Sequence, residues 1–209
     1  MEPQESVGVL EEKYSRRTFI KGVIATGATA SSTGYLFRGS PVGAATFQTA
    51  TERLITLNVN GQERSVDVLP HETLAMTLRY KLGLTGTKLG CDRAECGACT
   101  VLIDGVSQYG CSMLTHQVRG RAVTTIEGLE NPDTGELSIV QQAVMEEGGF
   151  QCAFCAPGFI MAMTAMIDEN PNPTVEEARV ALSGNLCRCA DYDKSLTCAM
   201  RAAELARSV

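Results

Sequence analysis

Nine cysteines in a chain of 209 residues limit what this sequence can fold into, because each thiol needs a partner, a metal or a buried place. Eight of them form two sets of four along the chain. The first set is Cys91, Cys96, Cys99 and Cys111, and the second set is Cys152, Cys155, Cys187 and Cys189. A disulfide framework fits poorly, since the total is odd and Cys187 and Cys189 are separated by a single residue.

The first set is spaced C-x4-C-x2-C-x11-C, and its opening C-x4-C-x2-C is the spacing of plant-type [2Fe–2S] ferredoxins. Two irons bridged by two sulfides need four converging thiolates, and one tight loop can present three of them. Gly90, Gly97 and Gly110 allow this loop to bend and to bring backbone N–H groups toward the sulfurs. A structural zinc site normally uses paired C-x2-C knuckles, so the x4 gap disfavours zinc.

The second set is spaced C-x2-C-x31-C-x1-C, and this spacing alone leaves zinc and an iron–sulfur cluster open. A C-x1-C pair is unusual for a zinc knuckle, and a cluster site in the same chain favours a second [2Fe–2S] cluster. The ninth cysteine, Cys198, is predicted to be a small buried apolar residue on the last helix.

The segment before the second set predicts a small α+β domain over residues 53–130. Asn-Gly at Asn60 and Gly61, between two alternating runs, is a strong hairpin signal. Thr73 is a plausible helix N-cap and Gly83 a plausible C-cap. The predicted elements are a hairpin over 53–69, a helix within 71–84, a strand and turn over 100–105, and a strand over 122–129.

The remainder, residues 137–209, predicts an all-α bundle with the cysteines of the second set in its loops or at its helix ends. Thr174 and Glu177 form a capping box, and Gly184 follows the end of the same helix. The predicted helices cover residues 137–149, 158–170, 173–184 and 193–208.

The first 45 residues resemble a twin-arginine export signal, because Arg16 and Arg17 precede Phe19, Ile20 and Lys21 and then a weakly apolar stretch. Small residues over 41–46 supply a cleavage site near Ala44 or Ala45. We therefore expect a periplasmic protein. This export route carries folded proteins, so metal can cap the thiolates in the reducing cytoplasm before the chain meets an oxidising compartment.

Hydropathy and charge argue against a membrane-spanning segment and against a nucleic-acid-binding surface. The longest apolar runs are shorter than the 18 or more residues that a bilayer-spanning helix needs, so no transmembrane segment is expected in the mature chain. The formal net charge is −6 and no dense block of Lys and Arg occurs, so a nucleic-acid surface is not expected.

Four motifs together resemble the iron–sulfur subunit of the xanthine oxidase family of molybdenum hydroxylases: "GTKLGCDRAECGACTVLIDG", "TTIEGL", "QCAFCAPG" and "SGNLCRC". The resemblance runs from about residue 53 to the C-terminus. With the export signal, the chain looks most like the iron–sulfur subunit of periplasmic aldehyde oxidoreductases. This resemblance implies a plant-ferredoxin-like (β-grasp) domain followed by a four-helix bundle, each holding one [2Fe–2S] cluster.

The resemblance also implies a role in electron transfer. Electrons would pass from a molybdopterin, of the cytosine dinucleotide form, on a separate large subunit to the bundle cluster. They would continue to the ferredoxin-like cluster, and then to an FAD-binding or haem-containing cytochrome subunit, during the oxidation of aldehydes. Gln151 and Cys189 would approach the pterin. No catalytic residue is expected on this chain. Alternatives are the same role in a complex that hydroxylates N-heterocycles, a free-standing exported carrier, or a zinc-stabilised interaction protein.

The sequence departs from the family pattern at two places. Ala153 stands where the family usually has glycine after the first bundle cysteine. Ala190, Asp191 and Tyr192 stand where it commonly has Thr-Gly-Tyr. Asp191 adds a negative charge beside the second set, and we expect it to lower the cluster potential or to alter the hydrogen bonds on the pterin side. All eight cysteine ligands are intact, so these departures concern tuning of the clusters.

Overall fold

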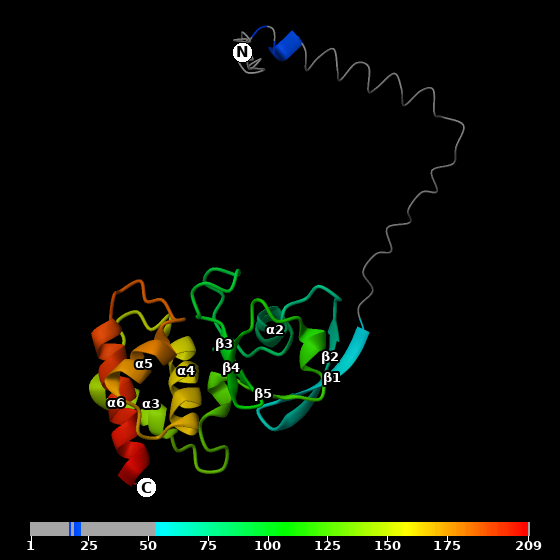
Figure 1. The fold of residues 1–209 in the computed structure, drawn as a ribbon. Helices are drawn as coiled ribbons and strands as arrows, with labels where there is room; N and C mark the ends of the chain where they lie inside the picture. Colours follow the sequence, from blue (N-terminus) through cyan, green and yellow to red (C-terminus); the bar gives the residue numbers. More distant parts are fainter. Residues whose placement is uncertain (1–16, 18, 22–52, 209) are drawn as a thin grey trace, which may run out of the picture. The chain divides into compact units, whose positions relative to one another are not determined.

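The computed structural model describes Arg17, residues 19–21 and residues 53–208 (Figure 1). Arg17 and residues 19–21 are helical. Arg16 and the cleavage region near Ala44 and Ala45 lie outside the described residues, so the export signal stays a prediction. The rest of the described chain lies within the second of two units, Thr49–Val209.

The first half of this unit is built on a five-stranded mixed sheet with strand order β2-β1-β5-β3-β4. β1 and β5 are parallel, and the other neighbouring strands are antiparallel. Alternation along β1 buries Ile55, Leu57 and Val59 in the core. The strands are β1 (Arg53–Val59), β2 (Gln62–Val68), β3 (Thr100–Ile103), β4 (Val106–Tyr109) and β5 (Ala122–Thr124).

The predicted hairpin is present, with φ of 55° at Asn60 and 72° at Gly61, as its two-residue turn requires. The strand and turn predicted over 100–105 are present, because β3 ends at Ile103 and Asp104 and Gly105 form a second such turn. The sequence did not predict β4, which follows this turn. The sequence of β4 hides it, since its residues are mostly exposed and polar. The strand predicted over 122–129 is too long, because the 3₁₀ helix η3 (Ile126–Gly128) follows β5.

The helix predicted between Thr73 and Gly83 is present, but its second half is wider than an α-helix. It consists of α2 (Leu74–Met76) and the π-helical turn η1 (Thr77–Lys81), and the Thr73 side chain accepts from the Met76 N–H as predicted. Glu72 is buried beneath the wide turn. Its carboxylate accepts from the Thr77 hydroxyl at 2.8 Å and pairs with Lys81 at 2.9 Å. The turn is therefore held by side-chain contacts with buried Glu72, which helical periodicity does not show.

The second half contains the four predicted helices, and the α+β fold class is confirmed. Ser138 and Gln141 form a capping box on α3, and Thr174 and Glu177 form the predicted one on α5. Phe159 and Met163 on α4 are fully buried in the bundle core. No helix among the described residues is long and apolar enough to cross a bilayer. The helices are α3 (Ile139–Glu147), α4 (Ala156–Glu169), α5 (Val175–Leu182) and α6 (Tyr192–Ser208).

The two halves meet at α4, which lies beside β3 and β4 (Figure 1). The Asn185 side chain, in the loop after α5, donates to the Gly97 carbonyl at 3.0 Å. The Tyr109 hydroxyl, at the end of β4, donates to the Gly184 carbonyl at 2.9 Å. Gly158 on α4 packs so closely that a Cβ there would lie 2.2 Å from the Gly97 oxygen. The junction therefore involves the loops that carry the cysteines.

The substitution Gly158→Ala tests this close approach. The added methyl group meets backbone atoms, so α4 must move away from residues 97 and 98, at a cost of about 1–3 kcal/mol in the free energy of unfolding. Thermal unfolding of the metal-loaded chain should show a midpoint lowered by several degrees. Glu169→Ala, at the exposed end of the same helix, is the control and should change stability little. A Gly158→Ala variant as stable as the natural chain would contradict the packing.

Candidate iron–sulfur centres

The loop over residues 91–99 turns through three residues with left-handed backbone. Asp92, Ala94 and Gly97 have φ of 53°, 60° and 68°. Glycine adopts this conformation freely, whereas aspartate and alanine do so at a steric cost. Alternating left-handed residues turn successive N–H groups toward one side, which makes a concave site for a negatively charged group. The sequence indicated Gly97 but gave no sign of the other two.

Four backbone N–H groups donate to sulfur atoms of the first set at 3.3–3.4 Å. Such bonds stabilise a thiolate or a sulfur ligand without placing a full positive charge beside it. They confirm the expectation that this loop brings N–H groups toward its sulfurs. The pairs are Ala94 to Cys111, Glu95 and Cys96 to Cys91, and Cys111 to Cys99.

The thiols of this set have divergent acidities. Burial alone would raise the pKa of Cys91, but the N–H groups around it outweigh burial and lower the pKa to about 7. Burial, together with the neighbouring Cys111 thiol, raises the pKa of Cys99 to about 12. Since metal ligation needs thiolates, a bound cation must supply the free energy that deprotonates the buried member. The set suits a metal centre better than a group of free thiols.

The second set comes from two loops of the bundle. Cys152 and Cys155 lie between α3 and α4, and Cys187 and Cys189 lie between α5 and α6. The Cys155 thiol is hydrogen-bonded to Cys187, and burial followed by this contact raises the pKa of Cys155 to about 12. The Cys152 thiol is hydrogen-bonded to Cys189, and the N–H of Phe154 is the main cause that lowers the pKa of Cys152.

The two alanines that depart from the family pattern have left-handed backbone. Ala153 has φ of 57° and Ala190 has φ of 61°. A glycine at residue 153 would adopt this conformation without the steric cost that alanine carries. The departure at Ala153 therefore adds backbone strain beside the second set.

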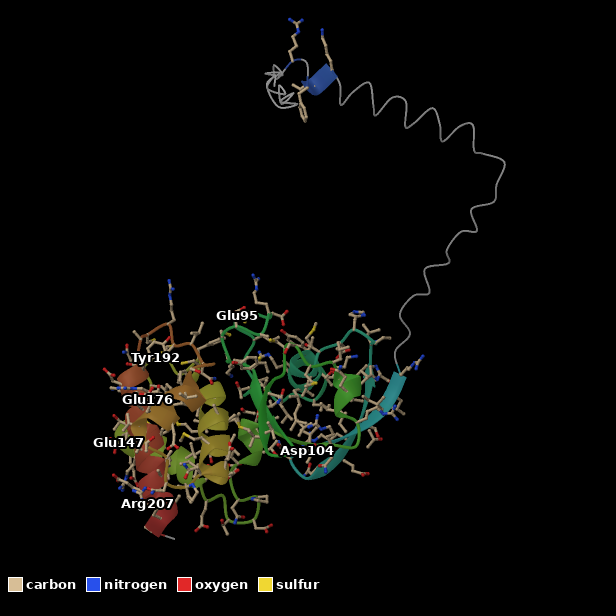
Figure 2. All side chains as sticks on the ribbon, in the orientation of Figure 1. Glu95, Asp104, Glu147, Glu176, Tyr192 and Arg207 are labelled. Atoms are coloured by element: carbon tan, nitrogen blue, oxygen red, sulfur yellow. The ribbon has the colours of Figure 1, made fainter. Side chains whose placement is uncertain are left out.

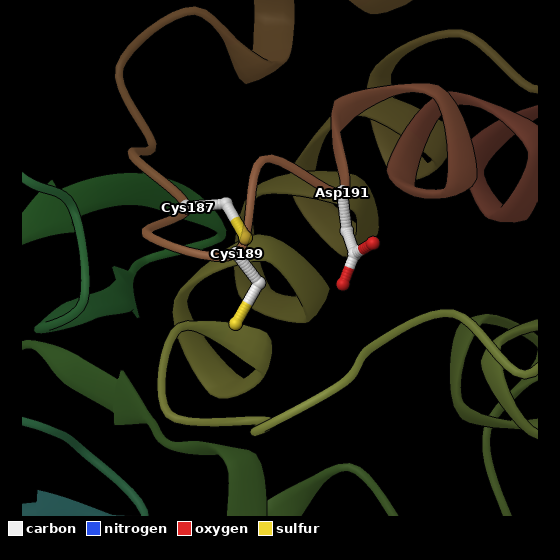
Figure 3. Close-up of side chains that lie close together, drawn as sticks. All are labelled: Cys187, Cys189 and Asp191. Atoms are coloured by element: carbon white, nitrogen blue, oxygen red, sulfur yellow. The ribbon is translucent and has the colours of Figure 1, made fainter.

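Asp191 and Gln151 lie at the edge of the second set. One carboxylate oxygen of Asp191 and the sulfurs of Cys187 and Cys189 all lie within 4.8 Å of one another (Figure 3). The Asp191 carboxylate also accepts hydrogen bonds from Gln151, which is exposed. The sequence predicted a place beside the centre for each residue, but it gave no signal that they contact each other.

The donor groups fit two iron–sulfur clusters. All nine cysteines fall within the described residues 53–208, and all are free thiols. Thiols within each set lie near one another, since Cys99 interacts with Cys96 and Cys111, and Cys155 interacts with Cys152 and Cys187. Backbone N–H groups point at sulfurs in both sets. Four cysteines for each centre and inward N–H groups suit [2Fe–2S] clusters. The assignment of the eight ligands stays a prediction, as does the approach of Gln151 and Cys189 to a pterin.

The remaining cysteine and the two histidines lie apart from the ligand sets. Cys198 is fully buried in α6, as expected, and burial raises the pKa of its thiol. Its sulfur packs on Gly149, where a Cβ would lie 2.5 Å away. His71 is exposed, and His116 is half-buried in the 3₁₀ helix η2 (Thr115–Val118).

One backbone hydrogen bond joins the two sets. The Leu186 N–H donates to the Cys96 carbonyl at 2.9 Å, and Leu186 precedes Cys187 in the chain. A cavity of about 440 Å³ lies between the loops, lined by cysteines of both sets together with Phe154 and Tyr192. Glu95, in the first loop, and Tyr192, at the start of α6, mark the two centres in Figure 2. The arrangement can pass electrons from one centre to the other.

Comparison with known proteins also indicates two iron–sulfur centres. The family of 2Fe-2S iron–sulfur cluster binding domains matches residues 57–121, and the family of [2Fe-2S] binding domains matches residues 125–200. The nicotinate dehydrogenase small FeS subunit of Eubacterium barkeri is 45% identical over 140 residues, which cover 67% of this chain and 88% of that protein. The aldehyde oxidoreductase iron–sulfur-binding subunit PaoA of Escherichia coli (strain K12) is 39% identical over 194 residues, which cover 85% of this chain and 83% of that protein.

Similarity to a solved structure extends over both halves. A chain of the crystal structure of quinoline 2-oxidoreductase from Pseudomonas putida 86 matches with a TM-score of 0.71 and 37% sequence identity. The match covers 76% of this chain and 98% of that chain. The two cysteine sets, their order along the chain and these similarities agree. The chain belongs to the small iron–sulfur subunits of the xanthine oxidase family of molybdenum hydroxylases.

Proposed function

We propose that this chain relays electrons within an exported, periplasmic aldehyde oxidoreductase. A separate large subunit would carry the molybdopterin, in its cytosine dinucleotide form, and an FAD-binding or haem-containing subunit would accept the electrons. The observation that carries the relay is the hydrogen bond from Leu186 to Cys96. It connects a residue beside one ligand set directly to a ligand of the other.

The chain's own residues supply the ligands and the connection between them. The cysteines of the first set would hold one [2Fe–2S] cluster and those of the second set another. Each cluster, when bound, accepts and releases one electron at a time. From Cys187, the path runs through the peptide bond to Leu186 and across its N–H to the Cys96 carbonyl. This path includes one non-covalent step between the two ligand-bearing loops.

The surface beside the second set suits a permanent partner. Phe154 is 48% exposed, Leu186 is 52% exposed and Tyr192 is 43% exposed, and all three surround exposed Cys152. Large exposed apolar groups gathered at one centre are typical of a subunit interface. This favours a place against the molybdopterin subunit over the free-standing carrier.

The surface beside the first set is polar, with Asp92, Arg93 and Glu95 exposed in the ligand loop. Charged groups at the rim of an interface steer encounters and suit partners that are exchanged more easily. We propose that the electron acceptor binds on this side, because the charged surface beside the first set differs from the apolar surface beside the second set.

The aldehyde class is supported by the extent of one similarity. The match to the aldehyde oxidoreductase subunit covers 85% of this chain. Residues 53–209 alone make up only about three quarters of this chain. This match therefore reaches into the N-terminal segment, where the export signal is predicted. The match to the nicotinate dehydrogenase subunit covers 67% of the chain.

The second candidate is the same relay in a complex that hydroxylates N-heterocycles. It is favoured by the higher identity, 45%, to the nicotinate dehydrogenase subunit. The substrate class depends on the large subunit, so rates of the purified complex on an aldehyde and on nicotinate distinguish the two candidates.

Metal analysis of the purified chain tests the two centres. About four irons per chain and two distinguishable paramagnetic resonance signals after dithionite reduction are expected for two [2Fe–2S] clusters. Cys189→Ser should remove or broaden one of these signals. Cys198→Ser makes the same change at the cysteine outside both sets and should keep both signals. Zinc in the bundle, or a Cys198→Ser variant that loses a signal, would argue against the ligand assignment.

A pair of substitutions at Leu186 tests the connection between the centres. Leu186→Pro removes the N–H that donates to Cys96, whereas Leu186→Ala shortens the side chain and keeps that N–H. With both clusters confirmed by their resonance signals, Leu186→Pro should slow reduction of the first centre by electrons from the second several-fold. Leu186→Ala should leave this rate close to that of the natural chain. Equal rates in all three proteins would remove this bond from the route.

The export prediction rests on the paired arginines. Replacing both Arg16 and Arg17 with lysine keeps the charge but removes the twin-arginine signal, so the protein should accumulate in the cytoplasm with its clusters bound. Cell fractionation followed by immunoblotting measures the distribution. Lysine replacement of Arg38, outside the motif, is the control and should leave export unchanged. Normal export of the double variant would show that the chain uses another route.

A further inference from the structure

A single carboxylate holds Gln151 through two hydrogen bonds. The backbone N–H of Gln151 donates to Oδ2 of Asp191 at 3.1 Å, and its side-chain Nε2 donates to Oδ1 at 2.7 Å. The two residues come from different loops, 40 positions apart. Each lies close to the second set in sequence, Gln151 immediately before Cys152 and Asp191 two residues after Cys189.

The Asp191 carboxylate accepts hydrogen bonds from Gln151 and not from the first turn of its own helix. Asp191 immediately precedes α6, where an aspartate side chain commonly accepts from the first N–H groups of its own helix. Here the N–H and hydroxyl of Ser195 both donate to the main-chain carbonyl of Asp191, at 2.9 Å each. Both side-chain oxygens remain for Gln151. Asp191 is only 8% exposed, and a buried carboxylate depends strongly on its hydrogen bonds.

The contact fixes the orientation of the Gln151 amide. An ionised carboxylate can only accept hydrogen bonds, so the NH₂ group of the amide must face Asp191. The amide oxygen, Oε1, therefore lies on the side of the amide that faces away from the carboxylate. Because Gln151 is exposed, its oxygen is available to a hydrogen-bond donor from outside the chain.

We propose that Asp191 is a positioning residue that makes Gln151 present its amide oxygen to an N–H donor at the pterin side of the partner subunit. This inference rests on the proposed function for the identity of the partner. It adds the polarity of the contact, since the partner must offer a donor where Gln151 offers an acceptor. It also gives the departure at Asp191 a role in docking.

Charge is the competing explanation, because the same carboxylate lies beside the sulfurs of Cys187 and Cys189 (Figure 3). Removing its charge would affect the second centre whether or not Gln151 is held. Asp193, exposed in the first turn of α6, offers the matched control. Asp193→Asn removes one negative charge two residues further along and leaves the Gln151 contact intact.

The test measures binding of the full-length, iron-loaded chain to the molybdopterin subunit that co-purifies with it. Asp191→Asn puts an NH₂ donor where Gln151 needs a hydrogen-bond acceptor. Gln151→Glu brings a second carboxylate beside that of Asp191, and the two repel each other. Each variant should raise the dissociation constant about 10-fold, the effect of roughly one hydrogen bond. Asp193→Asn should leave the dissociation constant unchanged.

The double variant Asp191→Asn with Gln151→Glu separates positioning from loss of structure. The single variants separate positioning from charge, because one removes a negative charge and the other adds one, yet both should weaken binding. Its asparagine can donate to the glutamate, and the second glutamate oxygen still faces outward as an acceptor. Binding should return to within about 3-fold of the natural chain, because the geometry and the acceptor are both restored. The paramagnetic resonance signal of the reduced second centre in the complex should also return to that of the natural chain. A double variant no better than the single ones, or an Asp193→Asn effect equal to that of Asp191→Asn, would overturn the proposal.

Hydrogen exchange on the chain alone separates failure of this inference from failure of the proposed function. Asp191→Ala should speed exchange of the Gln151 backbone N–H, and Asp193→Asn should not. Unchanged exchange in Asp191→Ala would refute the contact whatever partner the chain has. If exchange behaves as expected but no molybdopterin subunit co-purifies with the natural chain, the proposed function and its docking role are both wrong.

Discussion

The hydrogen bond between Leu186 and Cys96 is the contact on which the arrangement of both centres depends. It joins two loops that belong to different halves of the unit and carry different ligand sets. Asn185 reinforces it with a bond to the Gly97 carbonyl, and Gly158 lets α4 approach the same carbonyl. The candidate ligand loops are therefore also part of the packing surface between the sheet and the bundle, beside the contact of α4 with β3 and β4. Distance between the centres is set by a few backbone contacts, which change little as side chains vary.

Several features could be predicted from the sequence because they depend on local chemistry. Cysteine spacing identifies loops that gather thiolates, and Asn-Gly identifies the first hairpin. Thr174 and Glu177 mark the start of α5 through contacts within one helical turn. These signals gave the fold class and the two candidate sets, since each depends on short spacings such as C-x4-C-x2-C, C-x2-C and C-x1-C.

Other features depend on contacts between distant segments, and the sequence held no signal for them. The π-helical turn contacts a distant segment, because the Thr77 hydroxyl lies 2.7 Å from that of Thr115. β4 shows no apolar alternation and is defined by its pairing with β3. Left-handed alanine at residues 153 and 190 contradicts local preference, because the surrounding loops hold the backbone there. The contact of Asp191 with Gln151 spans 40 residues and two loops. Such pairs become visible only when tertiary structure brings both loops to one site.

Sharing loops between ligation and packing has a consequence for how the chain matures. A protein with independent domains can lose one cofactor and keep the other half intact, whereas here disorder in either ligand loop also loosens the junction between the halves. Cluster insertion and docking of the halves should then be cooperative, with few stable half-loaded forms. For a chain proposed to be exported in its folded state, such all-or-none maturation separates finished molecules from unfinished ones before they reach the membrane.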